Sequence, residues 1–187
     1  MLPLILASSS PYRREILQKL HVDFSYDSPN IDESIKTGET PTELVKRLAL
    51  EKAQAVSTKH PHALIIGSDQ VAVLDNTVMT KPHNHENAMK QLQASSGKKV
   101  TFLTSLCLFN SKTEEHQIAL CPYSVEFLSL TNAQIDAYLQ KEQPYNCAGS
   151  FKSEGLGITL FRRFEGDDPN SLIGLPLIEL VKMLRNE

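Results

Sequence analysis

The chain of 187 residues has 41% hydrophobic and 22% charged residues, which is close to the averages of globular proteins and excludes disordered and fibrous classes. Nineteen basic and twenty-two acidic side chains give a formal net charge of −3, which argues against a general nucleic-acid binder. The longest apolar runs, such as Leu4–Ala7, are too short to cross a bilayer, and Met1–Ala7 lacks the basic start of a signal peptide. We therefore expect one cytoplasmic domain, without membrane or nucleic-acid partners.

Strand and helix signals alternate along the chain. Strands are predicted from short apolar runs bounded by turn-forming residues, and helices from a capping residue followed by apolar residues at helical spacing. Strands that alternate with helices, together with one long hairpin, predict an α/β chain with a mixed sheet and flanking helices. In chain order, the predicted elements are a strand at Leu4–Ala7, a helix from Ser10 to Leu20, a helix from Thr40 to Ser57, a strand at Ala63–Ser68 with Val71–Leu74 as its extension, a helix from Asn84 to Gly97, a hairpin of Val100–Phe109 and Ile118–Leu128, a helix from Thr131 to Lys141, a strand at Ile158–Phe164 and a helix from Leu175 to Arg185.

The first candidate for a functional site is Ser8–Arg14, which leads from the predicted first strand into a helix. Backbone N–H groups, hydroxyls and Arg13 or Arg14 could bind a phosphate there, at the positive end of the helix dipole. A capped helix with two solvated arginines is the alternative, and the residues alone leave it open.

A second candidate is Asp69, at the carboxyl end of a predicted strand, where open α/β sheets place their active sites. Its carboxylate could hold a divalent cation and orient or deprotonate a water, and Glu33 could join it at the metal. Lys52 and Lys81 are further polar candidates. An ordinary turn aspartate, an acidic loop and solvated lysines are the alternatives, and each motif taken alone favours them.

The third candidate is the glycine-rich stretch at 147–157, which has three glycines within nine residues. Glycines would let the backbone approach a flat ligand, and Phe151 would offer it a stacking surface. The stretch does not match the phosphate-binding P-loop pattern, and a flexible turn is the alternative.

Taken together, these segments resemble the Maf family of nucleoside triphosphate pyrophosphatases over essentially the whole chain, 1–187. Several separated motifs in the same order are a more specific signal than any one of them. The matching stretches are Leu4–Arg14, Glu51-Lys52-Ala53, Ile66–Gln70, Thr80-Lys81-Pro82, the glycine-rich loop ending in Gly157, and Asp168–Pro176.

The resemblance implies an elongated α/β fold with two lobes around a deep cleft. It also implies hydrolysis of a nucleoside triphosphate between its α- and β-phosphates, with a divalent cation, Mg²⁺ or Mn²⁺, as cofactor. By the same resemblance, Asp69 matches the proton acceptor. The other polar residues of the phosphate and metal site would be Ser8, Arg13, Glu33, Lys52 and Lys81.

Substrate choice in this family is associated with the positions of Tyr12, Gln70 and Glu154. An aromatic residue, a glutamine and a glutamate there resemble the YceF-like subgroup, whose substrate is 7-methyl-GTP. A positively charged, N7-methylated guanine would stack on Tyr12 and attract Glu154, although the glutamate could equally accept the N1–H and exocyclic amine of unmodified guanine. Hydrolysis of dTTP or UTP is the alternative within the family, and a non-catalytic nucleotide-binding regulator of cell division is a second. The sequence leaves the oligomeric state open, and a homodimer is compatible with the resemblance.

Overall fold

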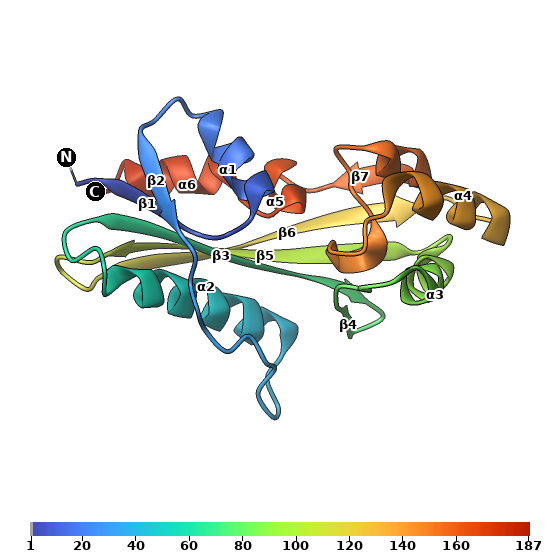
Figure 1. Cartoon of the computed structure of the whole chain (residues 1–187), viewed down its shortest axis with the longest axis horizontal. Coiled ribbons are helices and arrows are strands. Elements are labelled where there is room, and N and C mark those ends of the chain that lie inside the picture. The colour runs from blue at the N-terminus through green and yellow to red at the C-terminus, as the bar shows by residue number, and fades with distance from the viewer. Residues whose placement is uncertain (1) are drawn as a thin grey trace. The chain divides into compact units, whose positions relative to one another are not determined.

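The computed structural model describes residues 2–187 of the chain (Figure 1). Its strands form one sheet with the order β2-β1-β3-β5-β6-β7, and β4 pairs with β3. β1 pairs in parallel with β2 and β3, whereas the pairs β3–β4 and β6–β7 are antiparallel. The predicted mixed α/β architecture is therefore confirmed. The strands are β1 (Leu4–Ala7), β2 (Phe24–Asp27), β3 (Leu64–Leu74), β4 (Thr77–Met79), β5 (Lys99–Asn110), β6 (His116–Phe127) and β7 (Phe161–Glu165).

The helices begin close to their predicted caps. Ser10 accepts a hydrogen bond from the backbone of Arg13, and the predicted capping boxes at Thr40 and Thr131 are both present. No helix among residues 2–187 is both long and apolar enough to span a membrane. The helices are α1 (Pro11–Gln18), α2 (Pro41–Ser57), α3 (His85–Ser95), α4 (Asn132–Glu142), α5 (Asn170–Ile173) and α6 (Leu177–Leu184), with 3₁₀ turns η1 (Ala148–Ser150) and η2 (Leu156–Leu160).

The chain divides into two compact units, with boundaries inside β3, β5 and β6 and between β7 and α5. The first unit contains the residues up to Gln70, with Thr104–Cys121 and Asp168–Glu187. The second contains Val71–Leu103 and Pro122–Asp167. A cleft between two lobes of a single domain stays a prediction.

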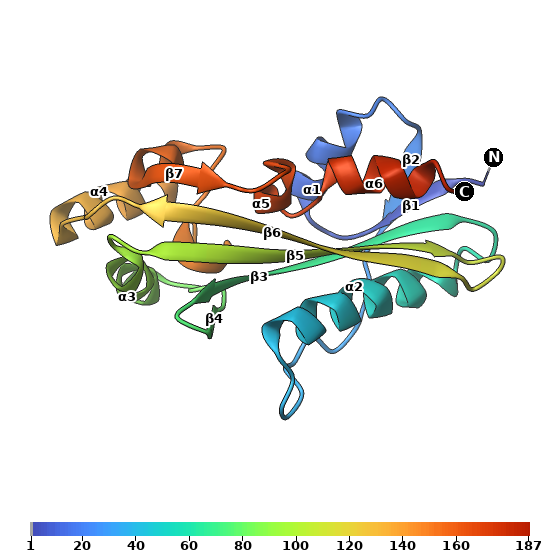
Figure 2. The ribbon, with the colours of Figure 1, turned by 180° about the vertical axis from the view of Figure 1, so that it is seen from behind.

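The core of the first unit has two parts because side chains alternate along β1, β3 and β5. On one face of the strands, Ile5 and Ile65 pack against Ala49 and Ala53 of α2. On the other face, leucines and isoleucines of the same strands pack against α1 and α6. Figures 1 and 2 show α2 on one side of these strands, with α1 and α6 on the other. Each fully buried Leu or Ile contributes about 1.5–3 kcal/mol, so this double packing fixes the orientation of β3.

The second unit contains an aromatic core that corrects one prediction. Phe151 is not a stacking surface for a ligand, because it is 5% exposed and packs edge-on against three other rings. Ring centroids lie 4.7 Å away at Phe161, 5.2 Å at Phe102 and 5.7 Å at Phe127. Gly149 beside it has a φ of +74° and lies against Phe102, so this part of the glycine-rich stretch serves to close the core.

Some element boundaries differ from prediction. The strand expected at Ile158–Phe164 begins only at Phe161, because residues 156–160 form the 3₁₀ turn η2. Helix α6 begins at Leu177, with Pro176 as its N-cap, and not at Leu175 as predicted. The strands β2 and β4 and the single turn α5 were not predicted from the sequence.

Candidate active site

An ion pair between Asp69 on β3 and Lys52 on α2 forms the centre of the candidate site. Asp69 points to the same face of β3 as Ile65 and Gly67, which is the face that α2 covers. The Nζ atom of Lys52 lies 2.7 Å from Oδ1 of Asp69. Because the two residues are only 5% and 6% exposed, their charges are compensated mainly by the protein and little by water.

Gly67 allows the helix to come this close to the strand. A Cβ atom at this position would lie 2.0 Å from the carbonyl oxygen of Ala49 and 3.1 Å from Cβ of Ala53, both on α2. Any side chain at position 67 would therefore push α2 away from β3, and with it Lys52 away from Asp69.

Glu33 reaches the same lysine from the loop between β2 and α2. Its Oε1 lies 3.0 Å from Nζ of Lys52, although 57% of the Glu33 side chain is exposed. Arg47 fastens this loop: its guanidinium binds both carboxylate oxygens of Glu39, at 2.6 and 2.8 Å, and donates to the carbonyl of Ser34 at 3.0 Å. Hydrogen bonds from Arg47 and from the backbone N–H of Lys36 lower the pKa of Glu39 to about 2, so this carboxylate stays ionised at neutral pH.

Arg13 on α1 brings a second positive charge toward the two carboxylates. Its Nε donates to the carbonyl of Gly174 at 2.8 Å. Burial lowers the pKa of the guanidinium, while the charges of Asp69 and Glu33 raise it. Since arginine keeps its proton in proteins, Arg13 is a permanent cation at this site.

Ser8 follows β1 directly and is 4% exposed. Its Oγ accepts a hydrogen bond from the backbone N–H of Ser10 at 3.1 Å. A hydroxyl that accepts in this way keeps its own proton for donation to an anion. The role of Ser8 in binding phosphate stays a prediction, but the geometry leaves its donor available for it.

The environment of Asp69 gives it an unusual protonation equilibrium. Burial raises the pKa of its carboxyl, Lys52 and Arg13 act to lower it, and the charge of Glu33 raises it further. The net effect is a raised pKa, which makes the carboxylate a better proton acceptor than an ordinary exposed aspartate.

The predicted specificity residues of the first unit differ in their surroundings. Tyr12 lies in the first turn of α1 and is 37% exposed. The amide nitrogen of Gln70 lies within hydrogen-bonding distance of Oγ1 of Thr104 and of the carbonyl oxygens of Ser171 and Leu172, at 2.8, 2.7 and 3.1 Å. A contact of Tyr12 or Gln70 with a nucleobase stays a prediction.

The other two predicted residues, Lys81 and Glu154, belong to the second unit, and both are exposed. Each lies within electrostatic range of the Cys147 thiol, whose pKa is raised mainly by burial. Lys152 and Lys81 act to lower that pKa, and Glu154 acts to raise it. The structure thus places Lys81 and Glu154 near one thiol, while their membership of the same site as Asp69 stays a prediction.

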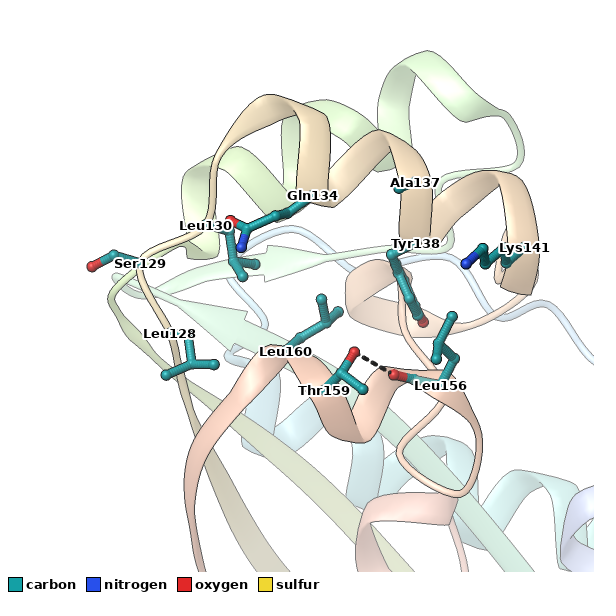
Figure 3. Close-up of a pocket in the computed structure, with 10 residues that line it drawn as sticks. All are labelled: Leu128, Ser129, Leu130, Gln134, Ala137, Tyr138, Lys141, Leu156, Thr159 and Leu160. Atoms are coloured by element: carbon teal, nitrogen blue, oxygen red, sulfur yellow. Dashed lines mark hydrogen bonds between the residues drawn. The ribbon is translucent and has the colours of Figure 1, made fainter.

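The second unit also contains a cavity of about 330 Å³ beside α4 and η2 (Figure 3). Its lining is mainly apolar, with Leu130, Leu156 and Leu160 among the contributors. Among the described residues that line the cavity, all of which lie between positions 128 and 160, Lys141 is the one with a charged side chain. None of the predicted site residues lines this cavity, so it is not the expected polyphosphate site.

Three residues that shape the candidate site were not among the predicted site residues. Gly67 interrupts an apolar strand, and an isolated glycine in a strand often marks a close backbone approach. Arg47 stands four residues before Glu51, a spacing typical of an ion pair on one helix face. Gly174, whose carbonyl accepts the hydrogen bond from Arg13, gave no signal beyond its place in a motif shared with the Maf family.

Fold and site together define an α/β protein in which a buried aspartate lies beside a lysine and an arginine, an arrangement suited to a polyanionic ligand and to proton transfer. The chain belongs to the Maf family, because the model described as "Maf-like protein" matches residues 3–187.

Curated relatives match almost the whole chain. It is 58% identical over 184 residues to a protein of Pseudomonas savastanoi pv. phaseolicola named "7-methyl-GTP pyrophosphatase", with 98% of this chain and 96% of the relative covered. A protein of Methylobacillus flagellatus with the same name is 55% identical over 187 residues, with coverage of 100% and 97%. A solved structure of a Vibrio cholerae protein aligns over 99% of both chains, but its TM-score of 0.44 and identity of 10% support no argument.

Proposed function

We propose that this chain is a nucleoside triphosphate pyrophosphatase that hydrolyses 7-methyl-GTP to 7-methyl-GMP and pyrophosphate. Its membership of the Maf family and the names of its relatives support this activity. The structural observation that carries it is the buried ion pair of Lys52 with Asp69, which the more exposed Glu33 also contacts and to which the charge of Arg13 couples. The role we infer is the removal of a modified nucleotide before polymerases use it.

The cations of the site are suited to a polyphosphate. A nucleoside triphosphate carries about four negative charges, which need compensation where water is excluded. Arg13 and Lys52 supply two positive charges in the first unit, and we assign a third to Lys81. We infer that the hydroxyl of Ser8 donates to a phosphate oxygen at the start of α1, where the helix dipole also favours an anion.

In this proposal, Asp69 is the proton acceptor. Phosphoryl transfer depends mainly on positioning and charge stabilisation, so no protein nucleophile is required. A water oriented by Asp69 attacks the α-phosphorus, its proton passes to the carboxylate, and pyrophosphate leaves. The raised pKa of Asp69 favours this transfer, and the hydrogen bond from Lys52 orients the carboxylate.

A divalent cation fits the donor set of this site. Lys52 contacts Oδ1 of Asp69 and Oε1 of Glu33, so among the described residues the second oxygen of each carboxylate is available. Residues 2–187 contain no group of three or more potential metal-ligating side chains, so Asp69 and Glu33 would share the ion with phosphate oxygens and water. That pattern is typical of Mg²⁺. Such an ion, Mg²⁺ or Mn²⁺, would supply charge compensation for the phosphates.

For the base, we assign recognition to Tyr12 and Glu154. Methylation at N7 makes guanine a cation, which an aromatic face and a carboxylate both attract. Tyr12 has the exposure that stacking requires, and Glu154 lies in the glycine-rich stretch of the second unit. Unmodified guanine could also bind a carboxylate through its N1–H and amine, so the comparison of 7-methyl-GTP with GTP tests this assignment.

A panel assay tests the proposal. Purified protein is supplied with Mg²⁺ or Mn²⁺ and with 7-methyl-GTP, GTP, dTTP or UTP, and the release of pyrophosphate is measured. We expect metal-dependent release with 7-methyl-GTP preferred. A preference for dTTP or UTP would refute the substrate assignment and leave the reaction standing. Tight nucleotide binding without pyrophosphate release under either metal would refute catalysis and favour a regulatory nucleotide-binding protein.

A further inference from the structure

The single turn α5 is held from one side by two polar side chains of the sheet. The carbonyl of Ser171 accepts from Nε2 of Gln70 at 2.7 Å and from Oγ1 of Thr104 at 2.8 Å. The carbonyl of Leu172 lies 3.1 Å from the same Nε2, which also donates to Oγ1 of Thr104 at 2.8 Å. Thr104 and Ser171 are almost fully buried, with 0% and 1% exposure, so water cannot easily replace these bonds.

The chemistry of the partners fixes the orientation of the Gln70 amide. Both carbonyls can only accept hydrogen bonds, so the NH₂ group of Gln70 must face them. The Gln70 amide lies on the face of β3 that contacts α5 because successive side chains of a strand point to opposite faces of the sheet. Ser68 and Gln70 point to one face of β3, while Asp69 between them points to the other, toward α2.

The other end of the same turn holds Arg13. Gly174 closes α5 with a φ of +111°, and its N–H bonds back to the carbonyls of Asn170 and Ser171. The carbonyl of Gly174 accepts from Nε of Arg13 at 2.8 Å and lies 2.9 Å from Oγ of Ser68. A Cβ atom at Gly174 would lie 3.2 Å from that same Nε, so the turn and the guanidinium are in close contact.

We propose that Gln70 is a positioning residue for Arg13, acting through α5 and Gly174 and not through contact with the nucleobase. Gln70 and Thr104 hold the carbonyls of Ser171 and Leu172, which sets the position of the turn and of the Gly174 carbonyl. That carbonyl orients the guanidinium toward the polyphosphate. The inference rests on the proposed function, since it assigns Arg13 to phosphate binding.

Two substitutions loosen the turn without touching Arg13. Gln70→Glu keeps the size of the side chain but replaces the donor with a carboxylate that repels the two carbonyls. Thr104→Val removes one hydroxyl and is the milder change, which keeps the test valid if Gln70→Glu unfolds. The control is Ser105→Ala, which removes the neighbouring buried hydroxyl on β5, bonded to the carbonyl of Ala119 and not to α5.

The first readout is binding of inorganic tripolyphosphate by calorimetry, because this probe has no base. We expect Gln70→Glu and Thr104→Val to bind it about tenfold more weakly, and Ser105→Ala to bind it as the wild type does. The ratio of kcat/KM for 7-methyl-GTP over GTP should not change in Gln70→Glu. Wild-type affinity for tripolyphosphate in both variants, with a changed ratio in Gln70→Glu, would show that Gln70 reads the base and would overturn the proposal.

The second readout is a double-mutant cycle with Arg13→Lys, which removes the Nε donor to Gly174. Because Gln70 acts through that bond, the effect of Gln70→Glu on tripolyphosphate binding should largely vanish in the Arg13→Lys background. Additive effects would overturn the proposal and leave only a structural role for Gln70. If the wild-type protein neither binds tripolyphosphate nor releases pyrophosphate, the proposed function itself fails. Failure of the Gln70 assignment alone leaves both wild-type properties intact.

Discussion

Gly67→Ala perturbs the site without changing any residue that would touch substrate. The new Cβ atom would lie 2.0 Å from the carbonyl oxygen of Ala49, whereas real Cβ atoms essentially never come within 3.0 Å of another heavy atom. Helix α2 or strand β3 must therefore move by about 1 Å at this contact. The distance between Nζ of Lys52 and Oδ1 of Asp69 is 2.7 Å, so a shift of this size would break the hydrogen bond between them.

We expect this shift to lower the rate strongly and the free energy of unfolding moderately. A misplacement of about 1 Å at a catalytic group costs about 10²-fold in rate, and overpacking costs about 1–3 kcal/mol of the free energy of unfolding. The assay measures kcat/KM for pyrophosphate release together with the urea midpoint. Gly97→Ala is the control for a loss of stability alone: its φ of +70° makes alanine strained there, but only Oγ of Ser129 lies near its Cβ position, at 3.4 Å, so kcat/KM should not change. A folded Gly67→Ala protein with wild-type kcat/KM would refute the claim that the contact between α2 and β3 sets the site.

Three further changes test the charges and packing around the site. Lys52→Gln should move the acid limb of the kcat/KM profile to higher pH, because Lys52 lowers the pKa of Asp69 and the acceptor must be ionised to act. Arg47→Lys cannot reproduce the forked contact, so the loop of Glu33 should loosen and the metal concentration for half-maximal rate should rise. Phe151→Ala should lower the free energy of unfolding by about 3–5 kcal/mol in urea titrations, because the ring is buried among three others.

Each of these predictions has a matched control or a contradicting result. Lys46→Gln, an exposed lysine on the same helix, should leave the pH profile in place, and an equal shift in both variants would contradict the role given to Lys52. If the metal concentration for half-maximal rate is unchanged in Arg47→Lys, the contact between Arg47 and Glu39 does not position Glu33. An unchanged urea midpoint in Phe151→Ala would mean that the ring contributes little to the core.

Local signals explain which parts of the fold could be predicted. Pro11 behind Ser10, and Glu43 three residues after Thr40, specify helix starts through bonds within one turn, and the structure has both helices there. The strand β2 (Phe24–Asp27) was missed although Phe24 and Tyr26 alternate with polar residues, because the pattern is only four residues long and none of these residues is buried.

The site was predictable as a set of residues but not as a set of contacts. Family resemblance pointed to Asp69 and Lys52, and the structure brings them together through the packing of α2 on β3. The bonds of Gln70 to Ser171 join segments 101 positions apart, so no local pattern could reveal them. Phe151 was misjudged for the same reason, since an aromatic ring beside glycines suits either a ligand or a core until its neighbours are known.

The role of Asp69 as proton acceptor is tested by comparing Asp69→Asn with the wild type in turnover and in affinity for 7-methyl-GTP. Asparagine keeps the shape of the side chain but cannot accept a proton from water, so kcat should fall by about 10²–10⁴-fold while the calorimetric affinity stays within a few fold. Asp23→Asn, at an exposed carboxylate, should change neither quantity. If Asp69→Asn turns over 7-methyl-GTP at the wild-type rate, Asp69 is not the proton acceptor and the account of the site is wrong.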